Sequence, residues 1–256
     1  MIVRTRNGVR EVDLKRRWRP LVAVLLLCSM FTTGGTAVAA PAKTANACGP
    51  VMFVLPGYQD GGAFNLLKPE LAPNGANPVR IPFPNAQQDI NLYADVDAGV
   101  ANLRTALYNL YVTSNCDLNT KVYIVGFSLG ALVAGTVLET EPPGRNIQGV
   151  LFSDGRRQSG ESNWPGDPGG LIGKLPVPGP GGAGLRPLDG FKYPTLTVCN
   201  GPRSAGGADG ICFLGSVADL NGYFTSHPFY TFDVGAELRA HGEGPYPNNL
   251  RNRVIP

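Results

Sequence analysis

The sequence has 256 residues with 22 basic and 19 acidic side chains, which gives a formal net charge of +3. The positive excess lies in residues 1–39, which hold 7 basic and 2 acidic residues, so residues 40–256 carry 15 basic and 17 acidic ones and a charge of −2. The basic excess therefore belongs to the N-terminal segment and does not indicate a nucleic-acid partner, and the remaining 217 residues are enough for one domain with a substantial core.

The N-terminal segment has the pattern of an export signal. Its basic residues precede an apolar run from Leu21 to Phe31, and Ala37-Val38-Ala39 offers a small-residue cleavage site before Ala40. We therefore expect residues 1–39 to be a signal peptide and residues 40–256 to be a secreted or cell-envelope domain. An uncleaved membrane anchor is the alternative, although the apolar run is short for a bilayer span of about 20 residues.

Alternating patterns along the rest of the chain predict strands and helices in turn. Apolar runs predict five strands, at Val51–Leu55, Val79–Pro82, Val122–Val125, Ile147–Ser153 and Thr195–Cys199. Amphipathic or apolar spacing predicts helices over residues 93–111, from Ala131 to about Glu141, and roughly over Phe229–Ala240. This order predicts an α/β fold with a parallel five-stranded sheet, helices on both faces, and the functional site at the carboxyl ends of the strands.

Residues 154–190 depart from this alternation. They contain 11 glycines and 6 prolines without an apolar period. A segment of this length without structure is unusual in a compact domain and is often functional. We consider two interpretations, a surface insertion and a flap that borders the substrate groove.

The third predicted strand runs into Gly126-Phe127-Ser128-Leu129-Gly130, and a helix follows. The pattern G-x-S-x-G between a strand and a helix is that of a nucleophile elbow. The glycines leave space around the strained turn on which the serine sits. Free N–H groups at the start of the helix favour negative charge beside the serine. The sequence therefore predicts Ser128 as a nucleophile.

A serine hydroxyl is a weak nucleophile and needs a base, which in turn needs an orienting acid. The chain has two histidines. His227 lies in a loop before the last predicted helix, whereas His241 lies at the far end of that helix, where the helix dipole alone can explain it. We therefore predict that His227 is the base.

The acid should lie between the serine and the histidine, in the chain order of an α/β hydrolase. Asp209 follows the fifth predicted strand and is bracketed by Cys199 and Cys212, so a disulfide there would hold its loop rigid. We predict Asp209 as the acid. Asp219 is the rival, and Asp154 and Asp189 are more distant candidates.

Four cysteines follow the predicted signal peptide, and an even number in an exported chain favours disulfides with three possible pairings. We favour Cys48–Cys116, which ties the mature N-terminus to the segment before the elbow strand, and Cys199–Cys212, which closes a short loop. A zinc site is the alternative, but no C-x-x-C motif or histidine cluster supports it.

The oxyanion hole should combine the N–H of Leu129 with one from the loop after the first strand. That loop reads Pro56-Gly57-Tyr58-Gln59-Asp60. Gly57, Tyr58 and Gln59 are all candidates, and the sequence does not choose between them.

The elbow, the pattern Cys199…Asp209-Gly210-Ile211-Cys212 and the later His227-Pro228-Phe229-Tyr230 together resemble the cutinase family. Other segments resemble the related PE-PPE serine-hydrolase domain of mycobacteria, namely Val79-Arg80-Ile81-Pro82-Phe83-Pro84, Ala98-Gly99-Val100-Ala101-Asn102-Leu103 and Asp154-Gly155-Arg156-Arg157. The resemblance spans residues 50–235. It implies a small α/β-hydrolase fold without a true lid, hydrolysis of carboxylic esters, and Ser128, Asp209 and His227 as the triad.

The sequence departs from these families at two places. Leu129 stands where both groups commonly have glutamine, so only the backbone donor of that residue is kept. The spacing from Cys199 to Asp209 is longer than in cutinases, and Gly201–Ala208 has the character of an insertion. This insertion could change the position of the aspartate relative to the histidine.

Together these patterns predict a secreted serine esterase that acts on small-molecule or lipid esters through an acyl-enzyme, as a monomer and without a metal or organic cofactor. Transient contact with the cell envelope or a lipid surface is part of this hypothesis. The alternatives are a cell-envelope acyltransferase that uses the same acyl-enzyme, and a non-catalytic wall-associated module.

Overall fold

The computed structural model describes residues 48–60, 63–84, 92–160, 164–174, 190–204, 206–242 and 252–255. All of them belong to one compact unit, Thr44–Pro256. The predicted signal peptide and its cleavage site lie outside the described residues. Within these ranges, no helix is long and apolar enough to cross a membrane.

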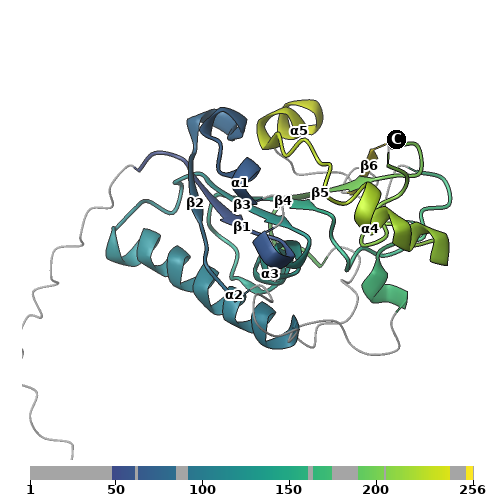
Figure 1. The fold of residues 1–256 in the computed structure, drawn as a ribbon. Helices are drawn as coiled ribbons and strands as arrows, with labels where there is room; N and C mark the ends of the chain where they lie inside the picture. Colours follow the sequence, from purple (N-terminus) through teal and green to yellow (C-terminus); the bar gives the residue numbers. More distant parts are fainter. Residues whose placement is uncertain are drawn as a thin grey trace, which may run out of the picture. The chain divides into compact units, whose positions relative to one another are not determined.

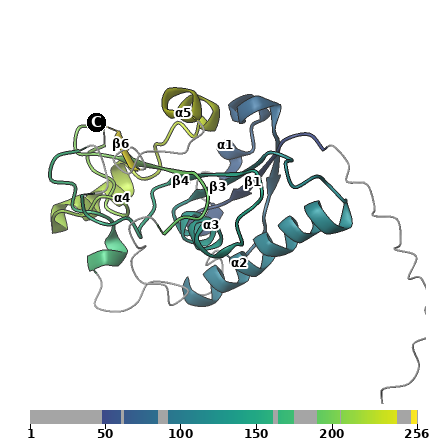
Figure 2. The same ribbon diagram turned by 180° about the vertical axis from the view of Figure 1, so that it is seen from behind.

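A parallel sheet of six strands forms the centre of this unit, in the order β2-β1-β3-β4-β5-β6 (Figures 1 and 2). The strands are β1 Val51–Leu55, β2 Asn77–Arg80, β3 Val122–Phe127, β4 Ile147–Phe152, β5 Thr195–Asn200 and β6 Asn252–Ile255. The five predicted strands are confirmed and are parallel to their neighbours, although the second, predicted at Val79–Pro82, begins and ends two residues earlier. β6 was not predicted, because its sequence Asn-Arg-Val-Ile is too short and polar to form an apolar run.

Helices cover both faces of the sheet, as predicted (Figure 1). Successive side chains of a strand point to opposite faces, and the core divides accordingly. Val122 and Ile124 of β3 pack in a cluster with α2 Leu92–Tyr108 and α3 Leu129–Thr140. The intervening Tyr123 and Val125 pack on the other face in a cluster with α1 Ala63–Leu66 and α5 Val234–His241.

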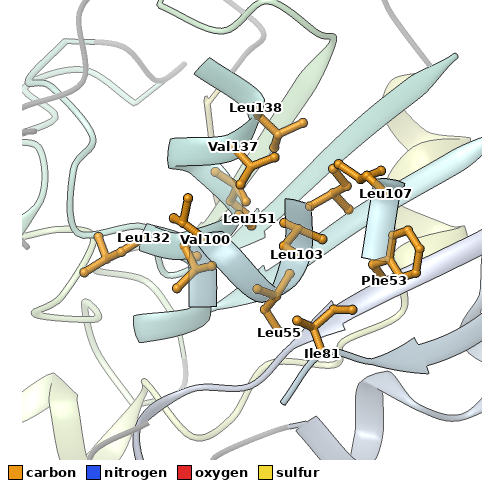
Figure 3. Close-up of a cluster of buried hydrophobic side chains, with 14 of the residues drawn as sticks. Phe53, Leu55, Ile81, Val100, Leu103, Leu107, Leu132, Val137, Leu138 and Leu151 are labelled. Carbon is orange, nitrogen blue, oxygen red and sulfur yellow. The ribbon is translucent and has the colours of Figure 1, made fainter. Parts of the chain in front are cut away.

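The predicted amphipathic helix over residues 93–111 is confirmed as α2, with a π-helical turn at Asn109–Thr113. Its apolar positions Val96, Val100, Leu103 and Leu107 are buried. Figure 3 shows Val100, Leu103 and Leu107 among the side chains of this cluster, together with Val137, Leu138 and Leu151. α2 therefore packs against α3 on this face of the sheet and holds α3 in place.

The last helix begins later than predicted. The sequence indicated a helix from about Phe229, but α5 begins at Val234, where the Asp233 side chain accepts a hydrogen bond from the backbone N–H of Ala236 at 2.7 Å. In the preceding segment, Tyr230 and Phe232 are buried in the core, and Phe232 has φ 54°. Because these two aromatic rings are buried, the segment before Val234 is not helical, although its apolar spacing indicated a helix.

The start of the segment 154–190 is well packed, which corrects the expectation of a structureless loop. Arg156 and Arg157 are both buried. Arg157 forms a buried ion pair with Asp167 and donates to the backbone oxygen of Cys212 at 2.6 Å. Arg156 pairs with Glu139 of α3 at 3.0 Å. The interpretation as a loose insertion is therefore wrong for residues 154–160 and 164–174. Residues 175–189 lie outside the described residues, so the interpretation as a flap stays a prediction.

We predict that Asp167→Ala strongly destabilises the fold, because it leaves the guanidinium of Arg157 buried without its carboxylate. The free energy of unfolding, measured by urea denaturation, should fall by about 3–5 kcal/mol. Arg104→Ala is the matched control, since it breaks a pair with Glu141 at 3.7 Å in which Arg104 is 48% exposed. That change should cost less than about 1 kcal/mol, and equal losses in the two variants would contradict the prediction.

Candidate active site

The residue between β3 and α3 has the backbone expected of a nucleophile elbow. Ser128 has φ 55° and ψ −116°, a conformation that L-residues rarely adopt. Its N–H donates to the backbone oxygen of Phe152 at 2.9 Å, which ties the turn to the neighbouring strand. The residue is buried, with 8% of its surface exposed, at the carboxyl end of β3.

The two glycines of the motif are required by close packing. A Cβ atom on Gly126 would lie 2.4 Å from the backbone oxygen of Gly130. A Cβ atom on Gly130 would lie 2.2 Å from the oxygen of Leu55 and 2.4 Å from that of Pro56. Backbone atoms cannot rotate away as side chains can, so only glycine lets α3 begin this close to β1.

Gly130→Ala should therefore lower the free energy of unfolding by about 2 kcal/mol or more, the cost of overpacking against backbone. Gly49→Ala is the control, since a Cβ atom there meets nothing within 4 Å, and it should leave stability within about 0.5 kcal/mol. Chemical denaturation of both variants measures the difference. A Gly130→Ala protein as stable as the control would show that α3 can move away without cost.

The predicted base lies beside the elbow. His227 follows α4 Gly222–Thr225, and its backbone N–H donates to the oxygen of Gly222 at 2.8 Å. Its ring stacks on Phe127, the residue before Ser128, with centroids 4.7 Å apart, and on Tyr223, with centroids 5.0 Å apart. Two aromatic contacts therefore hold the imidazole beside Phe127, the chain neighbour of Ser128, and no hydrogen bond joins Ser128 to His227 among the residues that this structure describes.

Asp209, the predicted acid, contacts this histidine. Its two carboxylate oxygens lie 3.1 and 3.0 Å from Nδ1 of His227. The carboxylate also accepts hydrogen bonds from the Tyr230 hydroxyl at 2.7 Å and from the backbone N–H of Ile211 at 2.9 Å. Since an ionised carboxylate only accepts, Nδ1 carries the proton, which leaves Nε2 free to accept one from another group.

The charge of Asp209 is maintained although the residue is fully buried. Burial alone would raise its pKa, but hydrogen bonds from His227, Ser153 and Tyr230, and the positive charge of His227 when that ring is doubly protonated, outweigh burial and hold the pKa below its usual 3.8. Because the folded pKa is the lower one, this network stabilises the fold at pH above 3.8 and the contribution is lost as the pH falls through the folded pKa. Burial and the Asp209 charge raise the pKa of Tyr230 well above its usual value, so its hydroxyl stays a donor.

The sequence analysis missed Ser153, which lies directly after β4. Its Oγ is 2.9 Å from Nδ1 of His227, and the side chain is fully buried. Ser153 has φ 56°, so it is strained in the same way as Ser128. Its position at the carboxyl end of a predicted strand was the one available signal, but a lone serine in a strand-end pattern has many structural explanations.

The other candidate acids have structural roles or are not described. Asp219 closes a capping box with Ser216, accepting from its backbone N–H at 2.7 Å and its hydroxyl at 3.2 Å. Asp154 is buried and accepts from a backbone N–H two residues on. Asp189 lies outside the described residues. Of the described candidates, Asp209 is the one in contact with His227.

The predicted oxyanion donors come from two adjacent segments. Leu129 is the first residue of α3 and is buried. The close approach of Gly130 to Leu55 and Pro56 places the end of β1 against that first turn. In the loop that follows, Gly57 is buried, Tyr58 is half-buried and Gln59 is exposed with φ 49°. The loop with the candidate donors therefore begins beside the elbow.

Both predicted disulfides are confirmed, with Cys48 bonded to Cys116 and Cys199 bonded to Cys212. The second bond joins the end of β5 to the turn that holds Asp209. Among the described residues, no three His, Cys, Asp or Glu side chains gather in a group that could hold a metal ion.

No protein-family model matches the sequence, and a search of curated proteins gave no match. Among solved structures, a cutinase-like protein from Cryptococcus sp. aligns over 76% of this chain and 94% of its own, with 18% identity and a TM-score of 0.50. An acetyl xylan esterase aligns over 76% and 99%, with 17% identity and a TM-score of 0.48. Lysin B from mycobacteriophage D29 aligns over 59% and 63%, with 19% identity and a TM-score of 0.40.

The likeness to the first of these structures concerns the fold. A parallel sheet with helices on both faces and a serine on a strained strand-to-helix turn define the α/β-hydrolase class. Within that class, the chain has a cutinase-like fold, as the sequence resemblance implied.

We predict that Asp209→Asn lowers kcat for ester hydrolysis by about four orders of magnitude, because an amide cannot stabilise the imidazolium or fix the productive tautomer. Asp219→Asn is the matched control. It should leave kcat unchanged while lowering the free energy of unfolding by about 1 kcal/mol through the weakened cap. Equal kcat values for Asp209→Asn and the wild type would exclude Asp209 as the acid.

Proposed function

We propose that this protein is a serine esterase in which Ser128 is the nucleophile, His227 the base and Asp209 the orienting acid. The observation that carries the proposal is a strained serine on a strand-to-helix turn, followed in space by an imidazole that stacks on the residue before the serine and is held at Nδ1 by a buried carboxylate. A buried carboxylate with a depressed pKa keeps the negative charge that an imidazolium needs beside it.

In the proposed reaction, Ser128 Oγ attacks the ester carbonyl carbon as its proton passes to Nε2 of His227. The tetrahedral intermediate collapses, the C–O bond to the alcohol breaks, and the imidazolium returns the proton to the leaving alkoxide. Water then attacks the acyl-enzyme by the same route, giving the carboxylic acid and free Ser128. Nδ1 keeps its proton throughout, because Asp209 stabilises the imidazolium without taking it.

Negative charge on the carbonyl oxygen would be stabilised by backbone N–H groups, that of Leu129 and one from the loop Gly57–Gln59. The buried position of Leu129 at the start of α3 supports this role, since low exposure strengthens hydrogen bonds to a developing charge. The dipole of α3 acts in the same direction.

Apolar esters are the proposed substrates. Large apolar side chains are exposed in the segments on either side of His227, namely Val217, Leu220, Phe224 and Phe229. Such side chains next to a catalytic histidine favour contact with an acyl chain or a lipid surface over a charged substrate. The two disulfides support a location in an oxidising compartment, secreted or in the cell envelope.

A fluorophosphonate probe tests the nucleophile directly, because it phosphonylates a serine only when a base activates it. Wild-type protein should gain one probe adduct on Ser128, seen by mass spectrometry of peptides, and should hydrolyse nitrophenyl esters. Ser128→Ala should lose both the adduct and the hydrolysis while unfolding at the same urea concentration. A wild-type protein that takes no label would refute the proposal.

A series of nitrophenyl esters of increasing acyl length, from acetate to long-chain esters, would then define the substrate class. The apolar surface predicts that kcat/KM rises with chain length before it levels off.

A further inference from the structure

Ser153 occupies a backbone position that favours glycine. It has φ 56°, in the left-handed region where a side chain is strained. Its N–H donates to the backbone oxygen of Val198 at 2.9 Å, so the strained turn is fixed to β5. A strained residue that is not glycine persists only where the surroundings hold it, and such residues cluster at functional sites. A role for the Ser153 side chain would explain why glycine is absent here.

The hydroxyl of Ser153 contacts the predicted catalytic histidine. Its Oγ is 2.9 Å from Nδ1 of His227. The same hydroxyl also lowers the pKa of the neighbouring Asp209 carboxyl. The residue is fully buried, so this contact is shielded from bulk solvent.

The positions of the protons follow from the chemistry of these groups. The Asp209 carboxylate accepts a hydrogen bond from Tyr230 and has further acceptor sites. The Ser153 hydroxyl can therefore direct its proton towards the same carboxylate and leave its lone pairs facing Nδ1. The Nδ1 proton of His227 then lies between the carboxylate and the serine oxygen. Two acceptors on different elements define the plane of the ring more closely than one.

From this geometry we propose that Ser153 is a positioning residue, which fixes His227 and Asp209 in the arrangement that the reaction requires. The inference rests on the proposed esterase function. Ser153 touches no reacting atom, and it acts through the imidazole. Its contribution grows as the imidazolium forms, because a hydrogen bond to a charged group is stronger than one to a neutral group.

Two variants separate this role from a structural one. Ser153→Ala removes the hydroxyl and keeps the backbone strain, whereas Ser153→Gly removes the hydroxyl and relieves the strain. Both should lower kcat for a nitrophenyl ester about 10- to 100-fold, the effect of losing a hydrogen bond to a charged group, with KM nearly unchanged. The glycine variant should nevertheless melt about 2–4 °C above the alanine variant.

Ser226→Ala is the matched control. Ser226 is also a buried serine and directly precedes His227, but its hydroxyl has no hydrogen-bond partner among the described residues. This variant should keep the wild-type kcat. All variants are also treated with the fluorophosphonate probe, which should still label Ser128, more slowly in both Ser153 variants.

The outcomes distinguish the inference from the function on which it rests. An unlabelled wild type refutes the esterase proposal itself. A labelled wild type together with wild-type kcat in both Ser153 variants overturns the positioning role. A loss of kcat in Ser153→Ala that is restored in Ser153→Gly also overturns it, because the cause is then backbone strain and not the hydroxyl.

Discussion

The buried carboxylate of Asp209 is the group on which the rest of the site depends. Its donors are Ile211 in its own turn and His227 and Tyr230 from the loop before α5, and Ser153 after β4 also lowers its pKa. A carboxylate buried without such partners would be strongly unfavourable. The segments that carry the donors must therefore assemble around Asp209 together, and the same assembly orients the histidine.

Backbone strain is concentrated at the ends of two neighbouring strands. Phe127 and Phe152 are paired in the register of β3 and β4, and each is followed by a serine with positive φ. Strain of this kind costs about 1–3 kcal/mol per residue. Aromatic packing offsets this strain, because the rings of Phe127 and Phe152 both contact Tyr230 and Phe232 at centroid distances of 5.0 to 5.9 Å.

A second buried ion pair holds the turn that carries Asp209. Arg157 pairs with Asp167 and donates to the backbone oxygen of Cys212, which is disulfide-bonded to Cys199 at the end of β5. The segment after β4 is thereby joined to the turn that presents Asp209. The Gly/Pro-rich composition of this segment concealed that role, because its structure comes from two arginines and their partners and not from a periodic pattern.

The sequence by itself determined the features that depend on local patterns. Apolar runs and spacing predicted the first five strands, α2 and α3. The G-x-S-x-G motif predicted the elbow, and the small number of histidines and cysteines predicted His227, the two disulfides and the contact with Asp209. Each of these depends on residue type and spacing within a short segment, or on counts that leave few choices.

Only the tertiary structure decided the rest. β6 forms because its backbone extends the edge of an existing sheet, and α5 begins late because Tyr230 and Phe232 are drawn into the core. Ser153 meets His227 across 74 residues of sequence. That contact exists only once β4 lies beside β3 and β5, so no local pattern could have distinguished Ser153 from any other serine at the end of a strand.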